Sequence, residues 1–185
     1  MRLFTAVPIP QPIQDLLHKL YTNIPTARWV DMANLHLTLK FIGEVDDTQA
    51  SGINTMLRTV QSPAFDLQLK GIGVFPQSKR KPPRVLWVGI SKSPELFTLQ
   101  KKVEAALATL GILPEDRPFS PHLTLARFKT QKPLMEVERL LTRHADFQLP
   151  PFRVTHFQLI QSQLTPQGAR YTLLAQYPLQ GDTDE

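Results

Sequence analysis

Two stretches of the chain share the tetrapeptide His-Leu-Thr-Leu: HLTLKFIG at His36–Gly43 and PHLTLARF at Pro121–Phe128. Because side chains alternate across a β-strand, each histidine shares a face with the threonine two residues later, and the leucines face the opposite side. The repeat therefore predicts two strands that bury their leucines and present an imidazole and a hydroxyl group together. If the two strands face each other, these groups surround one small anion.

Composition narrows the class of protein. The 185 residues are 42% hydrophobic and carry a formal net charge of +5, a balance that fits either an anionic partner or simple solubility. The absence of cysteine excludes disulfides, a thiol nucleophile and cysteine metal ligands. The N-terminal apolar run is short and is broken by Pro8 and Pro10, so we expect neither a signal peptide nor a membrane span, and a cytoplasmic location.

Strand and helix patterns alternate along the chain and look like a duplicated unit, each half with its own short sheet and about two helices. The patterns do not decide between parallel and antiparallel pairing. Helices are expected at Gln11–Tyr21, from a cap at Asp46 or Asp47 to Val60, at Pro94–Leu110 and at Pro133–His144. Strands are expected at Arg2–Val7, Leu35–Ile42, Phe65–Val74, Val85–Ile90, His122–Phe128, Phe147–Leu149, Thr155–Ser162 and Arg170–Tyr177.

Five segments resemble one known family in the same order: RLFTAVPIP, NLHLTLKFIGEV, RVLWVGI, RPFSPHLTLARF and RYTLLAQYPL. The family is that of the RNA 2′,3′-cyclic phosphodiesterases, or 2′-5′ RNA ligase-like proteins, of the two-histidine phosphoesterase superfamily. The resemblance covers nearly the whole chain. It implies an α+β fold of two pseudo-symmetric lobes, each an antiparallel sheet backed by helices, around a central groove. We expect one bilobal domain over residues 1–180 and a polar tail at residues 181–185.

The resemblance also implies an activity, the opening of RNA 2′,3′-cyclic phosphate ends to 2′-phosphomonoesters with no metal and no cofactor. Carried over residue by residue, it makes His36 the proton donor and His122 the proton acceptor. Thr38, Thr124 and Arg127 would then bind phosphate, and Phe41 would stack on the base. Pseudo-symmetry means that the sequence by itself does not tell the acid from the base.

Strict alternation conflicts with two of these assignments. Phe41 lies five residues after His36, and Arg127 lies five residues after His122, so each would face away from its histidine. Both reach the groove only if the strand twists, bulges or ends before them. We therefore expect such an irregularity in both motif strands.

Several alternatives remain open at this stage. A zinc site is disfavoured because cysteine is absent and the spacing is His-x-Thr. An RNA-binding module, a 2′-5′ RNA ligase acting on transfer-RNA halves, and a phosphoesterase for cyclic ADP-ribose phosphate or 2′-5′ oligoadenylate are the other candidates. The expected partner is RNA or a nucleotide with a cyclic phosphate end, bound by a monomer.

Two further sets of residues have both a functional and a structural interpretation. The basic stretch with Lys79, Arg80, Lys81 and Arg84 is either a solvated loop or an arm that follows RNA phosphates. The remaining histidines, His18, His144 and His156, have no paired partner in the sequence, and we interpret them as structural.

Overall fold

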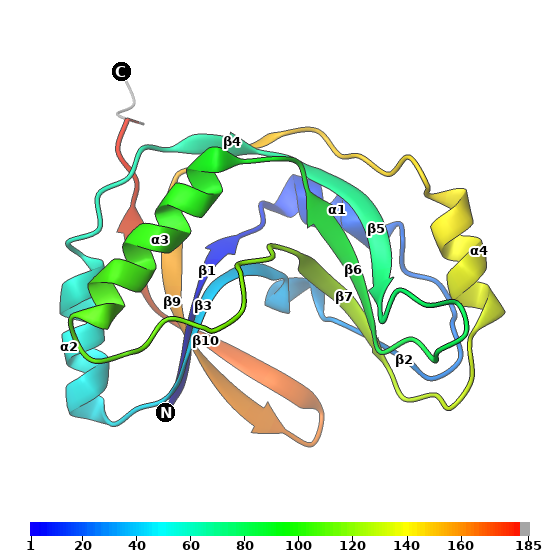
Figure 1. Ribbon diagram of the computed structural model, residues 1–185, viewed down its shortest axis with the longest axis horizontal. Helices are drawn as coiled ribbons and strands as arrows, with labels where there is room; N and C mark the ends of the chain where they lie inside the picture. Colours follow the sequence, from blue (N-terminus) through cyan, green and yellow to red (C-terminus); the bar gives the residue numbers. More distant parts are fainter. Residues whose placement is uncertain (182–185) are drawn as a thin grey trace.

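The computed structural model describes residues 1–181, and two antiparallel four-stranded sheets form its framework (Figure 1). The first sheet has the order β10 (Gly168–Pro178), β9 (His156–Thr165), β1 (Arg2–Pro8), β3 (His36–Glu44). The second has the order β2 (Ala27–Trp29), β7 (Leu123–Phe128), β6 (Val85–Ile90), β5 (Leu69–Phe75). A small third sheet pairs β4 (Phe65–Leu67) with β8 (Phe152–Val154).

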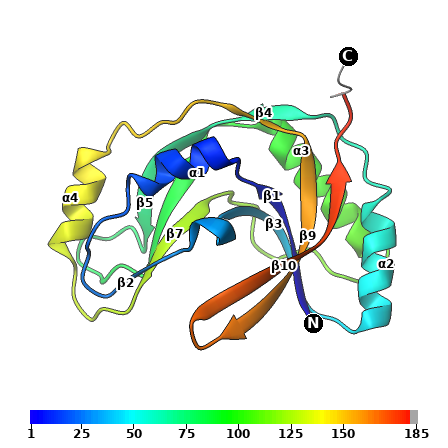
Figure 2. The same ribbon diagram turned by 180° about the vertical axis from the view of Figure 1, so that it is seen from behind.

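Helices accompany each large sheet. Figures 1 and 2 show α2 (Asp47–Leu57) and α3 (Pro94–Ala108) beside the first sheet, and α1 (Gln11–His18) and α4 (Met135–Arg143) beside the second. A short 3₁₀ turn, η1 (Met32–Asn34), leads into β3. Local chemistry sets the helix starts: the Asp46 carboxylate accepts the Gln49 N–H at 2.7 Å in a capping box, as expected for a cap at this position. None of the helices described is both long and apolar enough to cross a membrane.

The two lobes are not the two halves of the chain. Strands β9 and β10 come from the C-terminal half, yet they complete the sheet that holds β1 and β3. Strand β2 comes from the N-terminal half and pairs with β7 in the other sheet. The expectation of a duplicated unit in which each half forms its own sheet is therefore wrong, because the halves exchange strands.

The structure also corrects three local expectations. The short edge strand β2 has no pattern of its own and forms by pairing with β7. The stretch expected as one strand at Phe65–Val74 contains two strands, β4 and β5. The strand expected at Phe147–Leu149 is wrong: Gln148 makes only an isolated bridge to Lys70, and β8 begins after Pro150 and Pro151, which lack the N–H that a central strand donates. Of the expected tail, residues 182–185 lie outside the described part.

One hydrophobic cluster joins the two sheets, and it contains the motif leucines. Leu37 and Leu39 of β3 have exposed fractions of 0% and 3%, and Leu123 and Leu125 of β7 have 1% and 0%. These leucines anchor both motif strands in the same core, as the alternation predicts. The packed core is stiff, so the strands hold a fixed separation across the space between the sheets.

Candidate active site

A cleft of about 1250 Å³ lies between the two lobes, and both motif strands line it. His36 and Thr38 lie on β3, while Thr124 lies on β7 and His122 immediately precedes that strand. The cleft lining also includes Phe41 and Arg127. The structure thus brings all six residues singled out from the sequence to one cavity.

Matching β-bulges explain how Phe41 and Arg127 reach this cavity. Between β1 and β3 the pairing steps from Ala6↔Thr38 to Thr5↔Lys40, so Leu39 is an extra residue. Each bulge shifts the alternation by one residue, so the side chain five positions after the histidine returns to the histidine's face. Phe41 accordingly has an exposed fraction of 59%.

The second bulge occupies the equivalent position in the other motif. Between β6 and β7 the pairing steps from Trp87↔Thr124 to Leu86↔Ala126, so Leu125 is the extra residue. Arg127 is exposed as a result. The irregularity expected in each strand is present, and the pseudo-symmetry extends beyond the shared tetrapeptide to the backbone.

The bulge in β3 also turns Lys40 toward the interior. Its ammonium nitrogen lies 3.2 Å from Glu104 Oε2 of α3 and donates a hydrogen bond to the Leu113 carbonyl at 2.8 Å. Glu104 Oε2 is buried and has no hydrogen bond of good geometry, so the ion pair is what offsets its charge. Leu113 belongs to the loop that leads to His122. Lys40 therefore links β3, the first motif strand, to the loop that precedes β7, the second motif strand.

The two imidazoles have different surroundings. His122 Nδ1 lies 2.9 Å from the Ser120 carbonyl. A carbonyl only accepts, so Nδ1 carries the hydrogen, and in the neutral ring the lone pair is on Nε2. This tautomer suits a proton acceptor whose Nε2 is the reactive atom.

His36 is half-buried, and burial lowers its pKa from the ordinary value of 6.5. The Asn34 backbone opposes this effect by raising the pKa, although the buried Nδ1 of His36 makes no hydrogen bond of good geometry. Asn34 precedes His36 by two residues, as Ser120 precedes His122. The two motifs therefore share the local layout but differ in the hydrogen bond at Nδ1.

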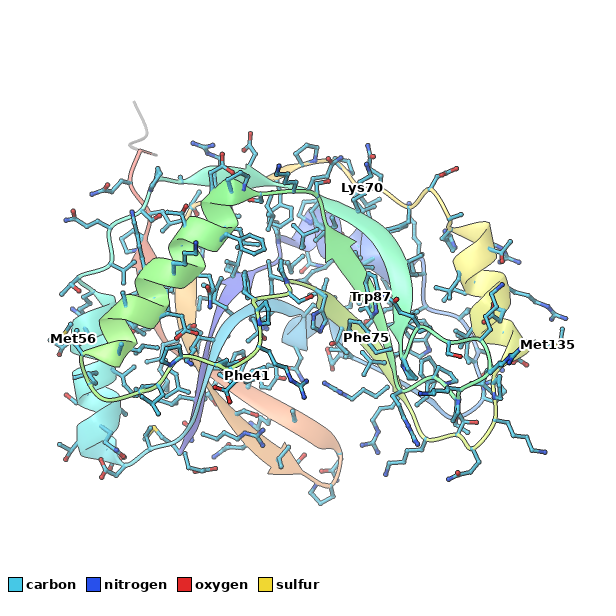
Figure 3. The ribbon with its side chains drawn as sticks, in the orientation of Figure 1. Phe41, Met56, Lys70, Phe75, Trp87 and Met135 are labelled. Carbon is cyan, nitrogen blue, oxygen red and sulfur yellow. The ribbon has the colours of Figure 1, made fainter. Side chains whose placement is uncertain are left out.

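Aromatic rings support each histidine. Phe75 packs edge-on against His122 with ring centroids 5.5 Å apart. The ring of Trp87 lies next to Phe75, as Figure 3 shows, with a centroid distance of 5.4 Å. In the first lobe, the ring of Tyr171 on β10 packs against His36, with ring centroids 5.9 Å apart, and against Phe4, with ring centroids 5.1 Å apart. These rings restrict how each imidazole turns and so preorganise the pair.

Sequence reasoning missed several residues of the cleft. The lining includes Arg28 of β2, Arg117 of the loop before β7, and the aromatic residues Phe75 and Tyr171. It also includes His18, for which the sequence pattern indicates only a structural role. Arg28 and Trp29 lie a short way before the first motif in the sequence, but β2 carries no repeat that marks them as functional.

The basic stretch at residues 79–84 does not contribute to the described lining of the cleft. None of Lys79, Arg80, Lys81 and Arg84 is among the described residues that line the cleft. Lys79 instead lies 3.8 Å from Glu138 of α4. Within residues 1–181, no group of three or more histidine, cysteine or carboxylate side chains is arranged to hold a metal ion.

Comparison of the sequence with known proteins identifies the family of the chain. The model of the 2′-5′ RNA ligase superfamily matches residues 10–166. The chain belongs to the 2′-5′ RNA ligase superfamily. Within that superfamily, it is 37% identical over 155 residues to the RNA 2′,3′-cyclic phosphodiesterase of Aeropyrum pernix, a match that covers 83% of this chain and 86% of that protein.

Solved structures of similar proteins have the same fold. The protein TT0787 of Thermus thermophilus superposes with a TM-score of 0.81 at 27% identity, covering 99% of this chain and 100% of that one. Escherichia coli LigT complexed with 3′-AMP superposes with a TM-score of 0.75 at 28% identity, covering 97% and 98%. The family resemblance and the α+β fold of two antiparallel lobes are both confirmed, and the pairing left open by the strand pattern is antiparallel.

Proposed function

We propose that this protein hydrolyses RNA 2′,3′-cyclic phosphate ends to 2′-phosphomonoesters, with His36 as proton donor and His122 as proton acceptor and with no metal ion. The observation that carries the proposal is the pair of imidazoles, each with its threonine, which line one cleft from equivalent bulged strands. Relatives such as the Aeropyrum pernix protein bear the name RNA 2′,3′-cyclic phosphodiesterase, which supports this substrate class.

The reaction needs one proton removed and one proton supplied on opposite sides of phosphorus. Nε2 of His122 takes a proton from water, whose oxygen forms a bond to phosphorus. The bond from phosphorus to the 3′-oxygen breaks, and that oxygen takes a proton from His36. The product carries a 2′-phosphate and a 3′-hydroxyl. Each proton transfer of this kind typically contributes about 10²–10⁴-fold in rate.

The other cleft residues bind the phosphate and the base. The hydroxyls of Thr38 and Thr124 and the Arg127 guanidinium donate hydrogen bonds to the non-bridging oxygens, where negative charge increases in the transition state. Phe41 offers an exposed ring next to Phe4, at a centroid distance of 6.0 Å, as a stacking surface for the base. The complex of LigT with 3′-AMP supports a nucleotide ligand for this fold.

The first test is incubation of the protein with adenosine 2′,3′-cyclic phosphate in EDTA, with products separated by chromatography. We expect adenosine 2′-phosphate as the product. We expect losses of about 10²–10⁴-fold in both the His36→Ala and the His122→Ala variants. A 3′-phosphate product, or activity abolished by EDTA, contradicts the proposal. A wild-type protein with no turnover would instead favour an RNA-binding module or a 2′-5′ ligase.

A second substrate separates the acid from the base. In 3′-deoxyadenosine 2′-(4-nitrophenyl phosphate), the departing 4-nitrophenolate is stable without a proton. The His36→Ala variant should therefore lose far less activity on this ester than on the cyclic phosphate, whereas His122→Ala should lose activity on both. The opposite pattern would exchange the two roles.

A further inference from the structure

The geometry points to a second anion site in the cleft, formed by Arg28 of β2 beside Arg127 of β7. This site binds a phosphate that does not react, namely the one on the 5′-oxygen of the terminal nucleotide. The inference rests on the proposed function, because it extends the substrate from a cyclic phosphate to a cyclic end that carries a further phosphate.

Strand register places the two arginines side by side. Arg28 and Arg127 are direct partners in the antiparallel pair of β2 and β7, in a stretch without a bulge. Direct partners have their side chains on the same face, with Cβ atoms about 5 Å apart. Both side chains are exposed, and both line the cleft. The two arginines therefore line the same cleft from neighbouring positions on one face of the sheet.

This arrangement is unfavourable without an anion. Like charges directly opposite each other destabilise a sheet. Among residues 1–181, neither arginine takes part in an ion pair. Two carboxylates also line the cleft, Asp31 and Glu115, and Asp31 already accepts the Ala33 N–H at 2.9 Å. An arginine fork matches phosphate oxygens in pairs, so a phosphate between the two groups offsets the repulsion.

The place of Arg28 on β2 separates this site from the reacting phosphate. Thr124 pairs with Trp87 and Arg127 pairs with Val85, so across the bulge at Leu125 the two residues are about 7 Å apart along β7. Arg127 is therefore close enough to bind the reacting phosphate together with the histidines and threonines, and Arg28, one strand further out on β2, is left for another charge. In RNA, the next phosphate after a 2′,3′-cyclic end is on the 5′-oxygen of the same ribose. Its source is either an internucleotide diester or a 5′-monophosphate.

Three substrates test the assignment. Adenosine 2′,3′-cyclic phosphate lacks the second phosphate, its 5′-phosphorylated form carries a monoester, and a dinucleotide with a cyclic end carries a diester. We expect Arg28→Ala to lower kcat/KM for the two phosphate-bearing substrates about tenfold relative to the first, mainly through KM. The lysine variant, Arg28→Lys, keeps the charge without the fork and should fall between. A preference between the last two substrates identifies the source of the phosphate.

The matched control is Arg139→Ala, which removes an exposed arginine of α4 that is not among the described lining residues of the cleft. This variant should leave the ratios between the three substrates as they are in the wild type. If Arg28→Ala lowers kcat/KM equally for all three substrates, the second phosphate site is overturned while the proposed function stands.

A binding measurement makes the test independent of turnover. Fluorescence anisotropy with a labelled tetraribonucleotide gives the slope of log K against log salt concentration. The magnitude of this slope falls by about 0.7 for each phosphate of a single strand that the protein no longer neutralises. We expect that decrease for Arg28→Ala and not for Arg139→Ala. An unchanged slope overturns the site even if the wild type proves inactive, an outcome that would by itself overturn only the proposed function.

Discussion

His36 and His122 begin identical tetrapeptides but occupy different environments. The His122 ring is oriented by the Ser120 carbonyl, whereas the buried Nδ1 of His36 has no hydrogen bond of good geometry. The sequence predicts the pair because the repeat is exact over four residues. It could not predict the difference, because the surroundings of His36 include Tyr171, which comes from a distant part of the chain.

The pH dependence should carry the signature of His36. Burial lowers the pKa of this imidazole below 6.5, and the proposed proton donor must be protonated. We therefore expect kcat/KM, which reports the free enzyme, to fall with rising pH through a pKa below about 6.5. An anionic phosphate beside the ring favours imidazolium, so the same limb of the kcat profile should lie at higher pH.

Rate measurements over pH 4–9 on a cyclic phosphate substrate give both profiles, and NMR titration of the free protein provides an independent reading of the imidazole pKa. If His36 titrates above 6.5 in the free protein, or if the limbs of kcat and kcat/KM coincide, this account of the donor is wrong.

At the scale of the strand, the bulges at Leu39 and Leu125 decide which residues can act. Ideal alternation would have turned Phe41 and Arg127 away from the histidines. The conflict with the family assignment predicted an irregularity, but not its position, because bulges depend on pairing with β1 and β6. For the same reason the sequence did not reveal that Lys40 would be buried or that Arg28 would meet Arg127.

Strand β5 carries a glycine that the second lobe needs. A Cβ on Gly73 would lie 2.7 Å from Trp87 Cη2, so the indole ring would have to move. That ring packs on Phe75, which in turn packs on His122. We expect Gly73→Ala to lower the free energy of unfolding by about 1–3 kcal/mol through overpacking, and to lower kcat by disturbing His122.

Gly52 of α2 provides the matched control, because a Cβ there has no neighbour within 4 Å. Gly52→Ala should raise the free energy of unfolding by about 0.5–1 kcal/mol, since alanine favours the helix. Urea titrations followed by tryptophan fluorescence compare the two variants. Equal stabilities for both alanine variants would mean that Trp87 adapts without loss.

At the scale of the whole molecule, the exchange of strands is the feature that sequence patterns described least well. Nearly all elements were expected close to their observed places along the chain. Their order, however, suggested two self-contained halves. Which sheet a strand joins depends on long-range pairing, and the pairing of β9 with β1 or of β2 with β7 has no local signature.

Cleavage in the exposed stretch Lys79–Lys81 tests this architecture. The two fragments would each contribute strands to both large sheets. We expect trypsin-nicked protein to elute as one species in gel filtration, to separate into two bands in SDS, and to keep its activity, because this stretch is not part of the described cleft lining. Fragments that part under native conditions would contradict the prediction.

If the nicked protein stays together as expected, the exchange of strands makes the peptide link at this loop dispensable once the molecule has folded. Two separately expressed pieces, ending and beginning within residues 79–84, would each be incomplete sheets with exposed edges. Mixed together, they can finish both lobes at once, and only the finished pair holds His36 and His122 across one cleft. Joining the pieces to two other proteins would turn turnover of a cyclic phosphate into a reporter of whether those proteins meet.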